Sequence, residues 1–190
     1  MELTTEDVIA ERELVGIHGD AVCVPDPTRT VHLQFRRFAG CPLCNLHLQS
    51  VVRRHDEIVA AGIAEVVVFH SEVDAMQLHL GDLPFPVVSD PERTLYTEFG
   101  IESSPKAVFH PGAWTGPLKP YAWKVGMRER RALNAEGRLT RGEDMLGLPG
   151  DFLIAPDGRV LAAKYGRHAN DQWSVDEMLG ILDTVTRSRA

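Results

Sequence analysis

Apolar positions near the start of the chain follow a strand period, then a helix period, then a strand period again. Residues 31–35 form a short apolar run that predicts a strand. The positions of the next stripe recur at spacings of four, three, four and three, namely Cys44, Leu48, Val51, His55 and Ile58. This stripe predicts an amphipathic helix over 41–61 that ends at Gly62. A near-continuous apolar run over 66–70 indicates a strand covered on both faces, so we expect a βαβ unit with parallel strands.

Two shorter patterns precede this unit. A helix-capping signal, Thr4 or Thr5 followed by Asp7, opens an apolar-periodic stretch to about Leu14. This pattern predicts a short N-terminal helix. The next two apolar runs are separated by the residues Gly and Asp at 19–20, which predicts a β-hairpin before the first strand of the βαβ unit.

The segment after the βαβ unit alternates helix and strand patterns. Residues 72–80 predict a short helix, and residues 85–91 predict a brief edge strand closed by prolines. A further helix is expected over 91–99, with Asp90 as its cap and Gly100 as its stop.

The alternation of helix and strand patterns is interrupted at 111–148 and resumes near the C-terminus. Residues 111–148 begin with several prolines and glycines and read as an insertion. Apolar runs at 151–155 and 159–165 flank a Pro-Asp-Gly turn, which predicts a β-hairpin. An apolar stripe over 174–186 predicts a closing helix.

Length and composition narrow the class of protein. With 190 residues the chain fits a single domain, residues 1–190, that can bury a core without a disulfide scaffold. Three cysteines are typical of a reducing compartment, where paired thiols are catalytic or metal-binding. The net charge of −7 argues against nonspecific nucleic-acid binding. No apolar leader and no stretch of about 18 apolar residues occurs, so we expect a cytoplasmic protein that does not enter membranes.

The sequence CPLC at 41–44 lies where the first strand gives way to the long helix. Backbone N–H groups and the helix dipole at a helix N-terminus favour a thiolate over a thiol. We expect Cys41 to be the exposed nucleophile, with Arg36 or Arg37 stabilising its thiolate. Cys44 falls on the inward stripe and would resolve the product by closing a disulfide with Cys41.

Other uses of these residues are less well supported. A structural zinc site needs four ligands, and no second CxxC or His-x₃₋₅-His pair lies nearby. His47 is expected on an exposed shoulder of the helix, where it could assist proton transfer. Cys23 is interpreted as structural. No Gly-rich phosphate loop occurs, so no nucleotide cofactor is expected, and electrons would come from a thioredoxin-like or glutathione-like thiol reductant.

Three segments of the chain carry a resemblance to a known family. Residues 85–91 (FPVVSDP) and 152–160 (FLIAPDGRV) resemble two segments of the AhpC/TSA peroxiredoxin superfamily of the thioredoxin fold. Residues 35–44 (FRRFAGCPLC) resemble its CxxC-containing peroxiredoxin-like subgroup, which includes prostamide/prostaglandin F synthase-like proteins. The resemblance implies an α/β, thioredoxin-like fold, in which helices flank a central mixed sheet and the insertion precedes the C-terminal hairpin.

The thioredoxin fold also implies a cis-proline opposite the CxxC, where backbone is presented to an extended substrate. Pro149 stands just before the C-terminal hairpin and fits this place, and Pro105 is a competitor. We prefer Pro149, because only the strand after it runs straight into a tight hairpin. Pro149 and Arg37 are therefore the candidate substrate-binding residues.

The chain departs from the peroxiredoxin pattern Pro-x-x-x-Thr/Ser-x-x-Cys, whose proline and hydroxyl frame the peroxide. Counting back from Cys41 places Phe38 at the hydroxyl position and Gln34 at the proline position. Counting back from Cys44 gives Cys41 and Arg37 instead. Neither cysteine carries the frame.

The leading hypothesis is a thiol oxidoreductase with antioxidant-type activity. It would use the Cys41/Cys44 pair to reduce a peroxide, an endoperoxide or a small-molecule or protein disulfide. Two alternatives remain: a non-catalytic thioredoxin-fold binding module that makes its contacts through 111–148, and a redox sensor. The oligomeric state is open, a homodimer included.

Overall fold

A mixed five-stranded sheet forms the centre of the computed structural model, which describes residues 2–101 and 147–188. Its strands are β3 (Thr30–Phe35), β4 (Ile63–Phe69), β5 (Val87–Ser89), β6 (Gly150–Ile154) and β7 (Val160–Tyr165). They lie in the order β5-β4-β3-β6-β7. β3, β4 and β5 are parallel, whereas β6 runs antiparallel to both β3 and β7. The predicted parallel βαβ unit, edge strand and C-terminal hairpin are confirmed.

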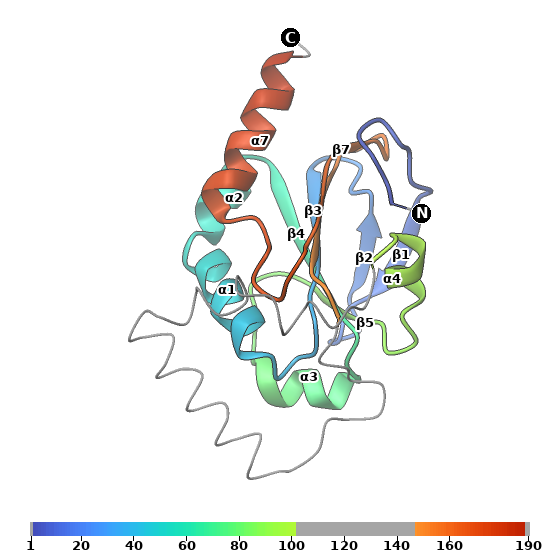
Figure 1. Ribbon diagram of the computed structural model, residues 1–190, viewed down its shortest axis with the longest axis vertical. Helices are drawn as coiled ribbons and strands as arrows, with labels where there is room; N and C mark the ends of the chain where they lie inside the picture. The colour runs from blue at the N-terminus through green and yellow to red at the C-terminus, as the bar shows by residue number, and fades with distance from the viewer. Residues whose placement is uncertain (1, 102–146, 189–190) are drawn as a thin grey trace.

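Helices and a hairpin cover the two faces of this sheet. The helices are α1 (Pro42–Arg53), α2 (His55–Ala60), α3 (Val73–Leu80), α4 (Thr94–Glu98) and α7 (Val175–Ser188). α1, α2 and α7 lie on one face (Figure 1). α4 lies on the other face with the hairpin of β1 (Arg12–Val15) and β2 (Ala21–Val24) (Figure 1). The chain thus has the thioredoxin-like α/β class that its sequence implies.

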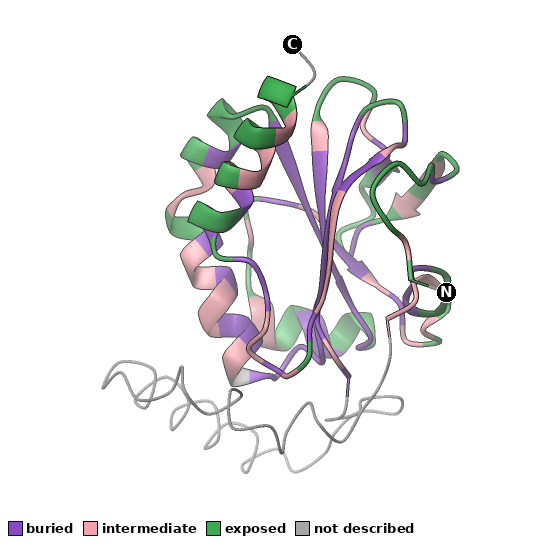
Figure 2. Ribbon diagram, turned by 45° about the horizontal axis from the view of Figure 1, so that its top comes forward, coloured by how far each residue is buried: buried purple, intermediate pink, exposed green. Residues whose placement is uncertain are grey.

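Both faces of the sheet are covered, and successive residues of each strand point to opposite faces. Every residue of β4 is buried, as the continuous apolar run predicts (Figure 2). In β3, Leu33 and Phe35 face the side of α4, where Phe35 packs against Tyr96 and Phe152. The alternate positions of β3 point toward α1 and carry polar side chains. These alternate positions are His32 and Gln34, whose side chains hydrogen bond to Glu65 of β4.

The predicted helix over residues 4–14 is wrong. Thr4 and Asp7 do pair, through bonds of 2.7 and 2.8 Å to the Asp7 carboxylate, but they close a turn. The chain then runs along β7, where the Ile9 N–H donates to Gly158 O at 2.9 Å. Residues 12–15 form β1 rather than the end of a helix. The edge of the sheet offers backbone partners that a short isolated helix lacks, so the extended conformation prevails.

The predicted continuous helix over 41–61 is interrupted at Arg54. Its backbone there has φ −115° and ψ 17°, and its N–H donates to the carbonyls of Val51 and Val52. The Arg54 guanidinium contacts Glu57 at 2.8 Å and Asp176 of α7 at 2.6 Å. The interruption therefore divides the predicted helix into α1 and α2, and both still pack on the sheet. The helix ends before Gly62, as expected.

Asp90 caps α4 with its side chain. Its carboxylate accepts the N–H groups of Thr94, Leu95 and Tyr96 at 3.0, 2.8 and 3.2 Å. The helix itself begins at Thr94, later than predicted, because Arg93 adopts a left-handed conformation. Satisfying these otherwise unpaired donors stabilises the helix N-terminus.

Replacing Asp90 with alanine is expected to lower the free energy of unfolding by about 1–2 kcal/mol, because three donors lose their acceptor. Urea denaturation measures this change. Glu92→Ala, at an exposed neighbouring position, serves as the matched control and should cost less than about 0.5 kcal/mol. Equal losses in the two variants would contradict the capping role.

The expected insertion at 111–148 lies outside the described residues, except for 147 and 148. The closing helix is confirmed as α7, which packs Val175 and Met178 into the same core as Cys44. None of the helices over residues 2–101 and 147–188 is both long and apolar enough to span a membrane.

Candidate active site at the start of helix α1

A buried connection leads from β3 to the first cysteine. The Arg36 N–H still donates to Val68 O of β4 at 2.9 Å, so the sheet register continues past β3. The chain then turns, and the Cys41 N–H donates to Phe38 O at 3.0 Å. Ser71, just after β4, accepts the Ala39 N–H at 2.8 Å. These bonds fix the entry of the chain into α1.

Cys41 is the N-cap residue of α1, with Pro42 at the first helical position. Proline suits this position because its missing N–H would be unpaired there. The first turn of α1 contains no acidic residue. The positive end of the helix dipole therefore acts on the Cys41 sulfur without an opposing carboxylate from its own helix.

Hydrogen bonds and a nearby cation make Cys41 the more acidic thiol. Its sulfur accepts the Cys44 thiol and the backbone N–H groups of Leu43 and Cys44, and Arg37 Nη1 lies 3.5 Å away. The Cys44 hydrogen bond, with Arg37, outweighs burial and lowers the pKa of Cys41 to about 6. A large fraction of Cys41 is therefore thiolate at neutral pH.

Cys44 has the opposite character. Because its thiol hydrogen bonds to Cys41 and because it is fully buried, the pKa of Cys44 rises well above its usual range. It packs in the core beside Leu48, as the helical stripe predicts. The two sulfurs therefore form one hydrogen-bonded pair, in which Cys41 carries the charge and Cys44 holds the proton.

The expectation that Cys41 is exposed is wrong, because only 1% of its surface is accessible. Burial extends over the preceding turn, where Phe38 and Ala39 are also buried. Arg37 lies over the Phe38 ring, with 5.5 Å between its guanidinium carbon and the ring centre. The N-terminus of α1 is thus buried, and a local sequence pattern does not predict how deeply a helix terminus is buried.

The other predicted site residues have mixed outcomes. Arg37, rather than Arg36, contacts the Cys41 sulfur, while its role in substrate binding stays a prediction. The Leu148–Pro149 bond is trans, since the described residues contain one cis bond, Val24–Pro25. The preference for Pro149 as the cis residue is therefore wrong, and Pro105 lies outside the described residues. Pro149 O accepts the Gly166 N–H at 2.8 Å.

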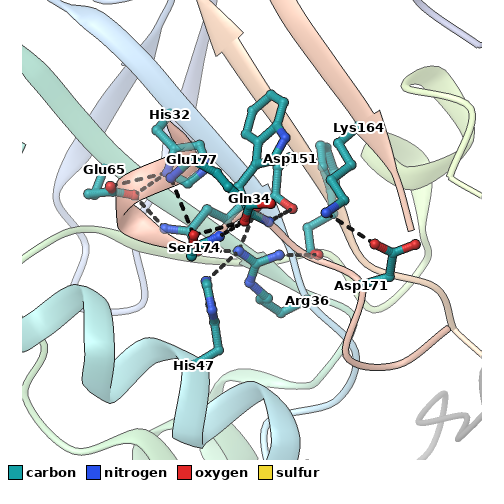
Figure 3. Close-up of polar contacts among 12 residues, drawn as sticks. His32, Gln34, Arg36, His47, Glu65, Asp151, Lys164, Asp171, Ser174 and Glu177 are labelled. Atoms are coloured by element: carbon teal, nitrogen blue, oxygen red, sulfur yellow. Dashed lines mark hydrogen bonds and ion pairs between the residues drawn. The ribbon is translucent and has the colours of Figure 1, made fainter. Parts of the chain in front are cut away.

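Sequence reasoning missed a cluster of polar side chains between the sheet and α1 (Figure 3). Its members are His32, Gln34, Arg36, His47, Glu65 and Asp151. Arg36 Nη2 lies 2.7 Å from Asp151 Oδ1 and also contacts Gln34 Oε1. His32 bridges two carboxylates, with Nδ1 2.8 Å from Glu65 Oε2 and Nε2 3.3 Å from Asp151 Oδ1. We call these six residues the buried polar cluster.

The charges of this cluster are paired. Burial alone would lower the pKa of His32, but Glu65 and Asp151 raise it to about 9. Burial would likewise raise the pKa of Asp151, but Arg36 and His32 hold it well below its usual range. Two cations thus face two carboxylates, as buried charges require.

His47 lies at the α1 side of this cluster and is partly buried, not on the exposed shoulder that was predicted. Its Nε2 accepts from Arg36 Nη2 at 3.2 Å. Burial and the Arg36 cation lower the pKa of His47 to about 3, so it is neutral. Its contact with Arg36 argues against the predicted proton transfer to Cys41.

A period-two signal for the buried polar cluster was present in the sequence. His32 and Gln34 alternate with apolar residues in a strand whose two faces are buried, and Glu65 falls on the facing position of β4. In the described part of the chain, no group of three or more His, Cys, Asp or Glu residues could hold a metal ion.

Several solved structures have a similar fold. Peroxidoxin BcpB from Mycobacterium tuberculosis aligns over all of both chains, with a TM-score of 0.65 and 18% identity. Peroxiredoxin 6 of Arenicola marina aligns with 98% of this chain and 75% of its own, with a TM-score of 0.67 and 15% identity. A thiol:disulfide interchange protein DsbE from Chlorobium tepidum aligns over 95% and 99%, with a TM-score of 0.58 and 20% identity. Among curated proteins, none matches this chain.

The order of the sheet and the helices on its two faces define a thioredoxin-like fold, which these solved structures share. The model of the AhpC/TSA antioxidant enzyme family matches residues 49–168, more than half of the chain. The chain therefore belongs to the AhpC/TSA family. This match begins just after the cysteine pair, so the chemistry of the pair rests on its own geometry.

Proposed function

We propose that the Cys41/Cys44 pair is a redox-active dithiol that reduces small organic hydroperoxides. The observation that carries this proposal is the asymmetry between the two sulfurs. Cys41 is charged beside Arg37, and Cys44 keeps its proton in the same hydrogen bond. A nucleophile and a resolving thiol are the two parts that such a cycle needs.

The proposed reaction has two steps. The Cys41 thiolate attacks the outer oxygen of the hydroperoxide, the O–O bond breaks, and the alkoxide that leaves takes a proton to become an alcohol. Cys41 is then a sulfenic acid. The Cys44 sulfur attacks the Cys41 sulfur, hydroxide leaves, and the Cys44 proton converts it to water. One hydroperoxide and two thiols give one alcohol, one water and one disulfide.

A cavity of about 340 Å³ supports a small organic substrate. It lies between α1 and α3 and is lined by Asn45, Leu48, Gln49, Val52, Arg53, His79, Leu80 and Leu83. The α1 residues at 45, 48, 49 and 52 continue the helical face on which Cys41 begins. An apolar substrate body would occupy this cavity, with its peroxide directed along α1 toward the buried Cys41.

The burial of Cys41 also favours a small substrate over a protein disulfide. Attack on a disulfide requires nearly linear access of a second sulfur to the Cys41 sulfur, and 1% exposure gives a folded partner little access. An external thiol reductant, thioredoxin-like or glutathione-like, would then reduce the Cys41–Cys44 disulfide. This step requires local opening at the start of α1.

Hydroperoxide consumption tests the proposal. The reduced protein, mixed with tert-butyl hydroperoxide, should consume one equivalent and form the Cys41–Cys44 disulfide. Added dithiothreitol should make the reaction catalytic. Leu83→Arg, which places a charge in the cavity, should raise KM at least threefold with a smaller change in kcat. Disulfide formation without turnover would instead favour the redox-sensor alternative, and the absence of a disulfide would refute both.

A further inference from the structure

Arg36 lies next to Arg37 but points to a different part of the molecule. Its side chain is fully buried in the buried polar cluster, whereas Arg37 reaches the Cys41 sulfur. Arg36 continues the backbone register of β3, and Arg37 follows directly in the bend that leads to α1, so the position of one residue constrains the position of the other. Whatever holds Arg36 inward therefore also directs Arg37 toward Cys41.

Backbone bonds hold Arg36 at both of its peptide groups. Its N–H donates to Val68 O at 2.9 Å, and its carbonyl accepts the Tyr96 hydroxyl. These bonds keep this segment at the end of the sheet. They do not set the position of the guanidinium, which depends on its side-chain partners.

Asp151 is the charged partner of that guanidinium. Both side chains have no accessible surface, and the ion pair of 2.7 Å spans β3 and β6. Asp151 is itself held by His32 (Figure 3), and its carboxylate also accepts the Trp173 N–H at 3.3 Å. A buried guanidinium without a counter-charge is costly and would turn toward water.

Arg36 also contacts the helix that carries the cysteines. Its Nη2 lies 3.2 Å from His47 Nε2, on the second turn of α1. The Asp151–Arg36 pair thus connects the sheet to α1 at two points, through the chain itself and through His47. The strand-to-helix connection between these points contains Arg37 and Cys41.

We propose that Asp151 is a positioning residue for the dithiol, whose ion pair with Arg36 holds the strand-to-helix connection so that Arg37 reaches Cys41. Asp151 acts through Arg36, which it pairs with at 2.7 Å, whereas Arg37 is the residue that reaches the Cys41 sulfur. The inference deepens the proposed function. It concerns the thiolate itself and not the identity of the substrate.

The direction in which the pKa of Cys41 changes when Asp151 is replaced separates a positioning role from a direct electrostatic one. Removing the Asp151 carboxylate deletes a negative charge and leaves Arg36 uncompensated, and both changes would lower the pKa of Cys41 by simple Coulomb effects. Displacement of Arg37 would instead raise it. The positioning role therefore predicts a raised pKa of Cys41, whereas the change in charge alone predicts a lowered one.

The experiment measures alkylation of reduced Cys41 by iodoacetamide across pH, in a Cys23→Ser background because Cys23 is an exposed thiol. Asp151→Asn is expected to raise the pKa of Cys41 by about one unit, which slows alkylation at pH 6 about fivefold. Arg37→Gln should slow it similarly, and adding Asp151→Asn to Arg37→Gln should slow it no further, because only the Coulomb effect of Asp151 then remains. A faster or unchanged rate, or an additive double variant, would overturn the proposal.

Asp151→Asn is buried, so circular dichroism must first establish that it folds. If it does not, Arg36→Lys provides the test, because it keeps a buried cation but loses the guanidinium that pairs with Asp151. This variant should slow alkylation at pH 6 about twofold, and an unchanged rate would then overturn the proposal. Alkylation needs no substrate turnover, so failure of the hydroperoxide assay and failure of the positioning role are distinguishable.

Discussion

Serine in place of Cys41 should abolish hydroperoxide reduction, whereas serine in place of Cys44 should leave the first step intact. The reason is the division of roles between the sulfurs. Only Cys41 is held as a thiolate, by its hydrogen bonds and by Arg37 at 3.5 Å. A serine hydroxyl at this position stays protonated and is a far weaker nucleophile.

The Cys44→Ser variant should consume one equivalent of hydroperoxide and then stop. Without a resolving thiol, Cys41 remains a sulfenic acid, which dimedone labelling and intact-protein mass spectrometry detect. Its first step should also be slower than in the wild type, because the serine hydroxyl replaces the thiol in the bond that lowers the pKa of Cys41.

Cys23→Ser is the matched control for both variants, since Cys23 is exposed on β2 and free. It should retain full turnover. Sulfenic acid at Cys44 in the wild type, or turnover in Cys41→Ser, would reverse the assigned roles. Loss of activity in Cys23→Ser would show that the pair at the start of α1 is not sufficient.

Folding stability should depend on the protonation of His32, with a contribution of about 2–3 kcal/mol at pH 7 that disappears by about pH 10. The pKa of His32 is raised in the folded protein to about 9 from 6.5. A raised pKa means that the folded state binds the proton more tightly. The stabilisation is therefore complete below about pH 6.5 and is lost as the pH rises through 9.

The measurement is the difference in unfolding free energy between the wild type and His32→Gln, from urea denaturation at pH 7, 8.5 and 10. The difference between proteins is needed because Cys41, whose pKa is lowered, contributes in the opposite sense over the same range. Leu78→Ala, which removes no titratable group at an exposed position, is the control and should show no such pH dependence. A difference that is constant from pH 7 to 10 would contradict the charged state of His32.

Local patterns were sufficient wherever one period dominated. The run at 66–70 predicted a doubly covered strand, and the stripe from Cys44 predicted the inward face of α1, because burial selects apolar residues at the repeat of each element. The helix predicted over 4–14 failed because the edge of β7 competes for its backbone. The break at Arg54 was not predicted, because it is accompanied by a contact to Asp176, which is far along the chain.

The candidate site likewise contains features that the sequence predicted and features that it did not. The cysteine spacing, its place after a strand and the adjacent arginines were evident in the sequence, and so was the class of chemistry. The buried polar cluster was not recognised, because its carboxylates come from β4 and β6 and meet His32 and Arg36 only when those strands align beside β3.

The sequence by itself determined the order of helices and strands over 31–99 and 150–188 and the two thiols at a helix start, since these depend on short-range periodicity and spacing. Its resemblance to a known family implied the thioredoxin-like class. Only the tertiary structure decided that Cys41 is buried, that Arg37 and not Arg36 serves it, and that Asp151 balances Arg36. Burial depth and charge pairing depend on which distant segments pack together. Both are set by the alignment of β3, β4 and β6 behind α1.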